Sequence, residues 1–99
     1  AENGVAISEW KTLDGSIPDY MRIDYMKRHI DAIKKIAEKY SVIGYFYWTL
    51  LDNFEWSLGY TRRFGLIYVD YKTQERTLKK SAYWYKKVIE TNGETDFEV

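Results

Sequence analysis

Two short stretches of this sequence combine carboxylates with side chains that suit a hydroxylated ligand. Glu2 opens an E-N-G triplet, which taken alone is typical of a surface turn, because glycine and asparagine tolerate tight backbone conformations. The second stretch follows Trp48 and reads D-N-F-E-W over residues 52–56. Carboxylates there could accept hydrogen bonds from sugar hydroxyls, while indole rings cover the apolar face of a pyranose. The alternative is structural, with Asp52 capping a turn and the rings filling a core.

The composition excludes several classes of function. The 99 residues carry 15 basic and 15 acidic side chains, so no net charge attracts nucleic acid or an anionic membrane. Cysteine is absent and His29 is the single histidine, which excludes a thiolate metal site or a histidine-rich one. No apolar run approaches the roughly 20 residues of a membrane-spanning helix. Lack of cysteine is found in cytosolic and in many secreted proteins, so the compartment stays undetermined.

Aromatic side chains make up 18% of the sequence, which fits either a sugar site or a core rich in large residues. The elements that would position them begin with a helix after Pro18, with Asp19 as its N-cap. Its apolar residues recur at steps of three and four: Ile23, Met26, Ile30, Ile33, Ala37 and Tyr40. Residues 42–51 form a continuous apolar and aromatic run, which predicts a strand buried on both faces.

The remaining elements are a loop over 52–63, a short strand over 64–69 and a polar turn or irregular hairpin over 70–77. Ser81 is expected to cap a last helix, which Asn92-Gly93 ends. The side chains expected to face inward on that helix are Ala82, Tyr85, Val88 and Ile89. A strand buried on both faces needs neighbours on both sides, and this set of elements does not supply them. The sequence therefore predicts a section of a larger α/β fold.

One long string carries a specific resemblance. G-Y-F-Y-W-T-L-L-D-N-F-E-W-S-L-G-Y-T-R-R-F-G-L-I-Y-V-D-Y, over 44–71, resembles the C-terminal signature of family-one glycoside hydrolases, the β-glucosidase family. The E-N-G triplet resembles that family's T/S-E-N-G nucleophile motif, with Ala1 where Thr or Ser is usual. R-I-D-Y over 22–25 and K-S-A over 80–82 resemble the family's helices. The resemblance implies the C-terminal segment of a TIM (β/α)8 barrel, from the end of strand 7 through helix 8. Residues 1–99 would be the C-terminal quarter of a single glycosidase domain.

The resemblance also implies a chemistry, retaining hydrolysis of β-glycosides through a covalent glycosyl-enzyme. Carried over by position, Glu2 matches the nucleophile, Glu55 the residue that binds glycone hydroxyls, Trp56 an indole on the same sugar, Trp48 the platform under the glycone and Phe64 an aromatic on the pocket wall. The family's acid/base Glu lies in an upstream N-E-P motif that this sequence does not contain. The implied partners are therefore a β-glycoside and a complementary barrel chain that carries this Glu. No metal or organic cofactor is implied.

Three interpretations remain open. The chain is a β-glycosidase fragment or subunit, active only with the rest of the barrel; a non-catalytic sugar-binding or assembly module; or a fragment whose copies associate with one another.

The family's phospho-sugar branch has Ser, Lys and Tyr side chains that bind the phosphate where this sequence has Glu55 and Trp56. Because a carboxylate would repel a 6-phosphate, the sequence favours an unphosphorylated glycone such as glucose, galactose or fucose. Arg62 and Arg63 lie close enough in sequence to Glu55 and Trp56 to affect the choice between a phosphorylated and an unphosphorylated glycone. Both are expected to form structural ion pairs instead.

Overall fold

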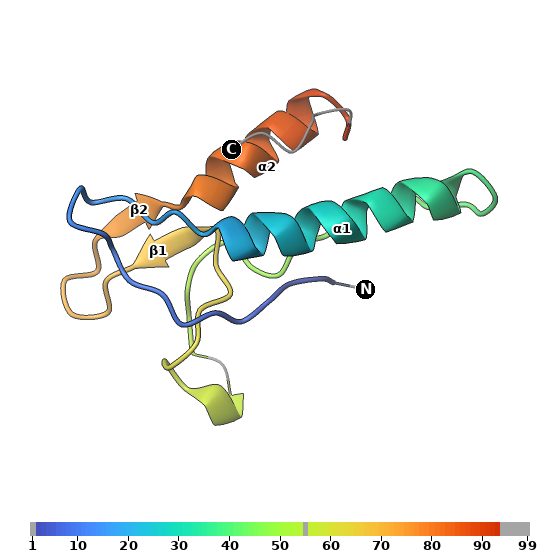
Figure 1. Ribbon diagram of the computed structural model, residues 1–99. Helices are drawn as coiled ribbons and strands as arrows, with labels where there is room; N and C mark the ends of the chain where they lie inside the picture. The colour runs from blue at the N-terminus through green and yellow to red at the C-terminus, as the bar shows by residue number, and fades with distance from the viewer. Residues whose placement is uncertain (1, 55, 94–99) are drawn as a thin grey trace.

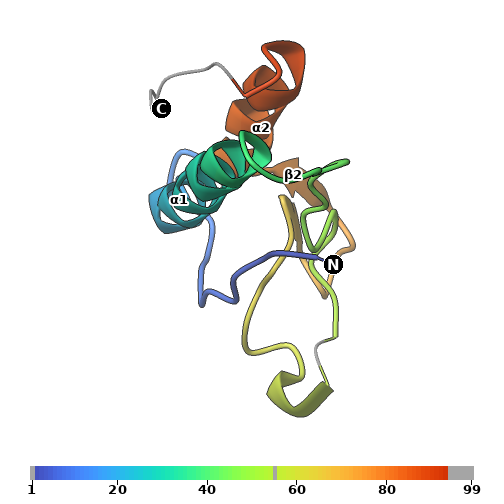
Figure 2. The same ribbon diagram turned by 90° about the vertical axis from the view of Figure 1, so that its right-hand side faces the viewer.

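A computed structural model describes residues 2–54 and 56–93 of the chain. The elements follow in the order α1 (Tyr20–Ala37), η1 (Trp56–Leu58), β1 (Ile67–Val69), β2 (Arg76–Leu78) and α2 (Lys80–Glu90). Figures 1 and 2 both show the loop with η1 at the end of the molecule opposite the two helices. They also place the blue N-terminal segment beside the green segment that follows α1. No helix in the described part of the chain is long and apolar enough to cross a membrane.

Helix α1 confirms the predicted start and the first half of the predicted stripe. Ile23, Met26 and Ile30 are buried, whereas Tyr40 lies beyond the end of the helix and is 69% exposed. The buried stripe packs with residues of α2 and of the segment before β1: Leu66, Trp84 and Val88 complete the core cluster. Asp19 holds the N-cap position, but its side chain makes no capping hydrogen bond to α1.

Helix α2 departs from expectation at its start and along its inner face. Lys79 is the N-cap residue, and Ser81 lies inside the first turn, fully buried. Trp84 and Val88 face the core, while Ile89 is 66% exposed. The expectation for Ile89 was wrong, because one residue past Val88 is about 100° further round a helix of 3.6 residues per turn.

The predicted end of α2 is confirmed. Asn92 adopts a positive φ of 55°, and its N–H donates to the carbonyl of Ile89 at 3.3 Å. The N–H of Gly93 donates to the carbonyl of Val88 at 2.8 Å. This pair of bonds forms a Schellman motif, which satisfies carbonyls that the helix end leaves open.

Residues 42–51 do not form the expected strand. Two isolated parallel bridges occur, Asn3 with Tyr47 and Leu51 with Ile67. A ladder extends only along a neighbour of several residues, and the described chain offers single bridging positions there. Burial on both faces was therefore wrong for this structure, since Phe46 is 67% exposed. The inner face is covered, because Tyr45 and Tyr47 pack against the core cluster.

The hairpin after this segment matches the prediction of a polar turn. Strands β1 and β2 pair antiparallel, with Ile67 opposite Leu78. In the turn, the Asp70 carboxylate accepts backbone N–H bonds from Lys72 at 3.0 Å and Thr73 at 3.1 Å. Strand β1 begins at Ile67, three residues later than the sequence pattern indicated.

Candidate functional site

The segment that begins with Glu2 pairs with the segment that contains Trp48. The N–H of Asn3 donates to the carbonyl of Phe46 at 3.0 Å, and the N–H of Trp48 donates to the carbonyl of Asn3 at 2.8 Å. Side chains alternate between faces in paired extended segments. Glu2, Phe46 and Trp48 therefore lie on one face, and Asn3 with Tyr47 on the other. Burial agrees, because Glu2 is exposed and Trp48 is 39% exposed, whereas Asn3 is half-buried.

Gly4 permits the close approach of these two segments. A Cβ atom at this position would lie 2.1 Å from the carbonyl oxygen of Trp48. Real Cβ atoms essentially never come that close to backbone, so a side chain would push the segments apart. The glycine of the E-N-G triplet is thus required for spacing rather than for a turn.

The inner face anchors the residue next to Glu2. The Asn3 Oδ1 accepts a hydrogen bond from the Tyr45 hydroxyl at 2.8 Å, and its Nδ2 donates to the Tyr25 hydroxyl at 3.2 Å. The Tyr47 hydroxyl donates to the backbone carbonyl of Phe64 at 2.8 Å. Burial raises the pKa of Tyr47 to about 12, so its hydroxyl stays protonated and keeps its donor role at neutral pH. These contacts, which the motif did not reveal, hold the backbone beside Glu2.

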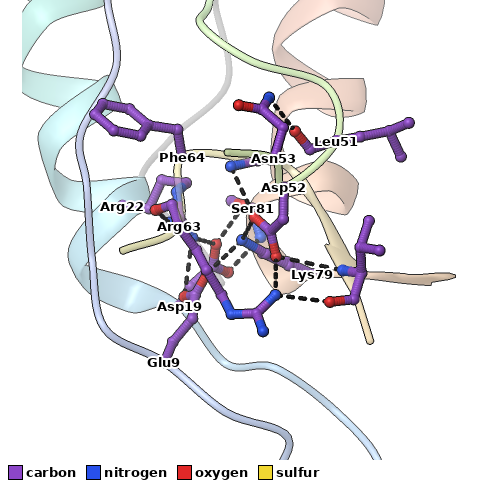
Figure 3. Close-up of polar contacts among 12 residues, drawn as sticks. Glu9, Asp19, Arg22, Leu51, Asp52, Asn53, Arg63, Phe64, Lys79 and Ser81 are labelled. Carbon is purple, nitrogen blue, oxygen red and sulfur yellow. Dashed lines mark hydrogen bonds and ion pairs between the residues drawn. The ribbon is translucent and has the colours of Figure 1, made fainter. Parts of the chain in front are cut away.

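Asp52 lies at the centre of a buried polar cluster (Figure 3). Its Oδ1 accepts from the Lys79 ammonium at 2.8 Å and the Gly65 N–H at 3.0 Å. Its Oδ2 accepts from Arg63 Nη1 at 2.7 Å and from the Val69 N–H at 3.3 Å. Burial opposes ionisation, but the two cations outweigh it and lower the pKa of Asp52. With its acceptor sites occupied, Asp52 has the structural role that sequence reasoning left open.

The cluster extends to charged residues that sequence reasoning did not single out. Lys79 Nζ also pairs with Glu9, and Arg22 Nη1 bonds Glu9 at 3.0 Å and Asp19 at 2.5 Å. Arg22 and Lys79 are fully buried. Burial and the charge of Arg22 lower the pKa of Lys79, against the attraction of Glu9 and Asp52. The i,i+3 spacing of Asp19 and Arg22 could have indicated their ion pair. Nothing in the sequence around Lys79 indicated that its side chain is buried.

Arg63 forms the ion pair expected of it. Its guanidinium pairs with Asp52 and also donates to the carbonyl of Val69 at 2.8 Å. The same group lies over the rings of Tyr68 and Tyr71, at 4.0 and 4.5 Å from their centroids. Because Asp52 begins the loop and Arg63 ends it, their contact closes the loop at its base.

Of the other sequence-predicted site residues, Trp56 lies apart from the paired segments, whereas Phe64 is bonded to one of them through its backbone carbonyl. Trp56 is in η1 on the projecting loop and is 87% exposed (Figure 1). Phe64 is half-buried, and its ring points away from the polar cluster (Figure 3). Glu55 lies outside the described residues. The backbone pairing thus places Glu2 and Trp48 on one face, and the contact of Asp52 with Arg63 holds the loop of Trp56 at its base. No three His, Asp or Glu side chains among the described residues are grouped to hold a metal ion.

Known proteins match this chain along nearly its whole length. The pattern of Glycosyl hydrolase family 1 matches residues 1–94. Beta-glucosidase A of Thermotoga maritima is 52% identical over 96 residues, which are 96% of this chain and 22% of that protein. The 1,4-beta-D-glucan glucohydrolase of Thermotoga neapolitana is 49% identical over 96 residues, again with 22% of its length covered.

Solved structures agree with the sequence matches. A family 1 β-glucosidase from Thermotoga maritima superimposes with a TM-score of 0.91 at 52% identity, covering 97% of this chain and 22% of that structure. The Thermotoga maritima β-glucosidase in complex with castanospermine gives a TM-score of 0.90 with the same coverage. These neighbours are TIM barrels, and the present chain spans 22% of their length. On these matches and on the shared signature, the chain belongs to glycosyl hydrolase family 1.

Proposed function

We propose that this chain is the C-terminal part of a retaining β-glycosidase and contributes the nucleophile Glu2 together with part of the glycone pocket. One observation carries the proposal: the backbone pairing of Asn3 with Phe46 and Trp48, which puts Glu2 and Trp48 on the same open face of two segments. A carboxylate beside an indole on one face suits attack on a sugar that stacks on the ring. On this proposal, residues 1–99 run from the end of barrel strand 7 through helix 8.

The open face supports the need for a complementary barrel portion. Phe46 lies on it with Glu2 and Trp48 and is 67% exposed, and Leu50, further along the same segment, is 62% exposed. The opposite face is already covered by the helices, as expected for the outside of a barrel strand. The interior of such a barrel is packed with side chains, so this face requires further strands to cover it. Those strands would also carry the acid/base Glu.

The proposed reaction proceeds in two displacements. The ionised carboxylate of Glu2 attacks the anomeric carbon, while the acid/base Glu of the complementary portion protonates the leaving oxygen. That second Glu then deprotonates a water, which releases the sugar and frees Glu2. The two carboxyl groups would lie about 5–5.5 Å apart. Trp48 would lie under the glycone, Glu55 and Trp56 would bind it from the loop, and Phe64 would line the pocket wall.

A chimera tests the proposal. This chain replaces the matching 22% of Thermotoga maritima Beta-glucosidase A, and hydrolysis of an aryl β-glucoside is measured. The parent chimera should be active, and Glu2→Gln should lower kcat on the order of 10³-fold or more. Glu38→Gln, an exposed position at the end of α1, is the matched control and should retain activity.

A nucleophile is distinguished from a merely nearby carboxylate by chemical rescue. Glu2→Ala leaves space for azide, which would attack the anomeric carbon and give the α-glycosyl azide, inverted relative to the substrate. A folded parent chimera with no turnover would contradict the proposal. If that silent chimera bound deoxynojirimycin, which a Thermotoga maritima relative binds, the alternative of a non-catalytic sugar-binding module would take its place.

A further inference from the structure

The segment of Glu2, residues 2–9, and the loop of Trp56, residues 52–63, are joined by contacts of backbone and of side chains. The backbone contact lies between Ile7 and Arg63, whose N–H and carbonyl groups bond reciprocally at 3.0 and 2.8 Å. It fixes the end of the loop to the segment that follows Glu2. The start of the loop, at Asp52, has a different attachment to that segment, made through a side chain.

Lys79 makes this second attachment. Its ammonium donates to Asp52 Oδ1 at 2.8 Å and pairs with Glu9, which lies in the segment of Glu2. The side chain is fully buried, and its backbone N–H donates to the carbonyl of Leu66 at 3.0 Å. One rigidly held cation therefore bridges the two segments from the base of α2.

The surrounding charges leave this bridge little freedom. The acids of the cluster are Glu9, Asp19 and Asp52, and its bases are Arg22, Arg63 and Lys79. Each buried charge has an opposite charge within bonding distance, so displacement of one member would leave its partner unpaired in a dry environment. The network thus favours one relative position of the two segments.

We propose that Lys79 is a positioning residue, whose buried ammonium fixes the nucleophile segment against the base of the sugar-binding loop. The inference rests on the proposed function, because it assigns roles to Glu2 and to the loop of Trp56. Small misalignments of reacting groups slow the chemical step far more than they weaken substrate binding. Loss of the bridge should therefore lower kcat and leave KM nearly unchanged.

The test uses the chimeric barrel described above, with two substitutions of Lys79. Lys79→Met keeps the length of the stem but removes the charge, and should lower kcat roughly 10- to 100-fold with KM changed less than about threefold. Lys79→Arg restores a cation and should recover most of the lost kcat. Lys11→Met is the matched control: its ion pair with Glu75 is partly exposed at the surface, so both constants should stay at the parent values.

Several results would overturn the inference. A folded Lys79→Met chimera with the kcat of the parent would do so, as would a rise in KM alone or a failure of Lys79→Arg to recover activity. If Lys79→Met does not fold, the triple substitution Glu9→Gln, Asp52→Asn and Lys79→Met removes the Lys79 charge together with the charges of its two partners. A folded triple variant should again have a lowered kcat, and parent kcat in it would contradict the positioning role.

A silent parent chimera would refute the proposed function without deciding the role of Lys79. Crystal structures of the parent and of Lys79→Met chimeras then provide the readout. The inference expects the segment of Glu2 and the loop that starts at Asp52 to shift against each other in the variant. Superimposable segments in the two crystals would refute it.

Discussion

The carboxylate of Asp19 accepts hydrogen bonds from both the backbone N–H and the hydroxyl of Ser81, at 2.8 and 2.5 Å, across 62 positions of sequence. Asp19 occupies the N-cap of α1, yet its side chain serves the first turn of α2. A carboxylate at the start of a helix satisfies open N–H groups and complements the positive end of the helix dipole. The starts of the two helices are therefore fixed to each other.

Asp19→Asn should destabilise the folded chain by about 2–4 kcal/mol. The amide can accept from Ser81 but leaves the buried Arg22 guanidinium without one of its counter-charges. The urea midpoint of the chimera measures the effect. Asp24→Asn is the control, since its ion pair with Arg28 is exposed and should change stability by less than about 0.5 kcal/mol. Equal effects of the two substitutions would contradict the helix-linking role.

Gly4→Ala should separate the segments of Glu2 and Trp48. The added Cβ would lie 2.1 Å from the Trp48 carbonyl oxygen, so the backbone has to move. We expect a loss of about 1–3 kcal/mol in stability and a larger proportional loss of activity in the chimera. Gly44→Ala is the matched control, because its Cβ would meet only the ring of Phe46, at 3.8 Å. Full activity in Gly4→Ala would show that the close approach of the two segments is not needed for activity.

Stability in acid should depend on Asp52. Burial opposes its ionisation, but Lys79 and Arg63 lower its pKa in the folded state. Its contribution to stability is therefore complete above the unfolded pKa of about 3.9 and is lost as the pH falls through the lower folded value. Asp52→Asn should lower stability by about 3 kcal/mol at pH 7.

The difference in stability between the parent and Asp52→Asn should shrink as the pH falls below about 4. Urea midpoints from pH 7 to pH 2 measure it. Asp31→Asn is the control, on the partly exposed side of α1. A difference that stays constant down to pH 2 would show that Asp52 does not carry this part of the acid sensitivity.

The isolated chain should self-associate. Ile43 is 98% exposed and Leu50 is 62% exposed along a segment whose backbone is paired only at isolated positions. Size exclusion with light scattering should show oligomers, and Ile43→Lys with Leu50→Lys should reduce them. Leu13→Lys changes a fully exposed residue outside this segment and serves as control. A clean monomer with a cooperative melt would contradict the prediction.

Local patterns predicted the helices and the hairpin turn, because those elements depend on residues close in sequence. The spacing of Ile23, Met26 and Ile30 sufficed for α1, and Asn92-Gly93 sufficed for the end of α2. The strand expected over 42–51 failed for a different reason. Its formation depends on neighbouring strands, and the described chain supplies only single bridging positions.

The candidate site could be predicted from the sequence only in part. Motifs named Glu2 and Trp48, but their common face follows from backbone pairing between distant segments. Apart from the ion pair expected of Arg63, the buried cluster was missed, because its members come from the segment of Glu9, both helix starts and the loop base. Charged residues scattered in this way resemble surface charges in a sequence, and Lys79 carries no local sign of full burial.

The alternation along residues 45–48 has a consequence for how this protein can vary. Tyr45 and Tyr47 pack against the helices, whereas Phe46 and Trp48 point to the open side. Odd-numbered positions therefore govern how firmly the scaffold holds together. Under the proposed function, even-numbered positions govern which sugar is accepted. Ligand preference could then drift through replacements at alternate positions while the packing beneath them stays unchanged.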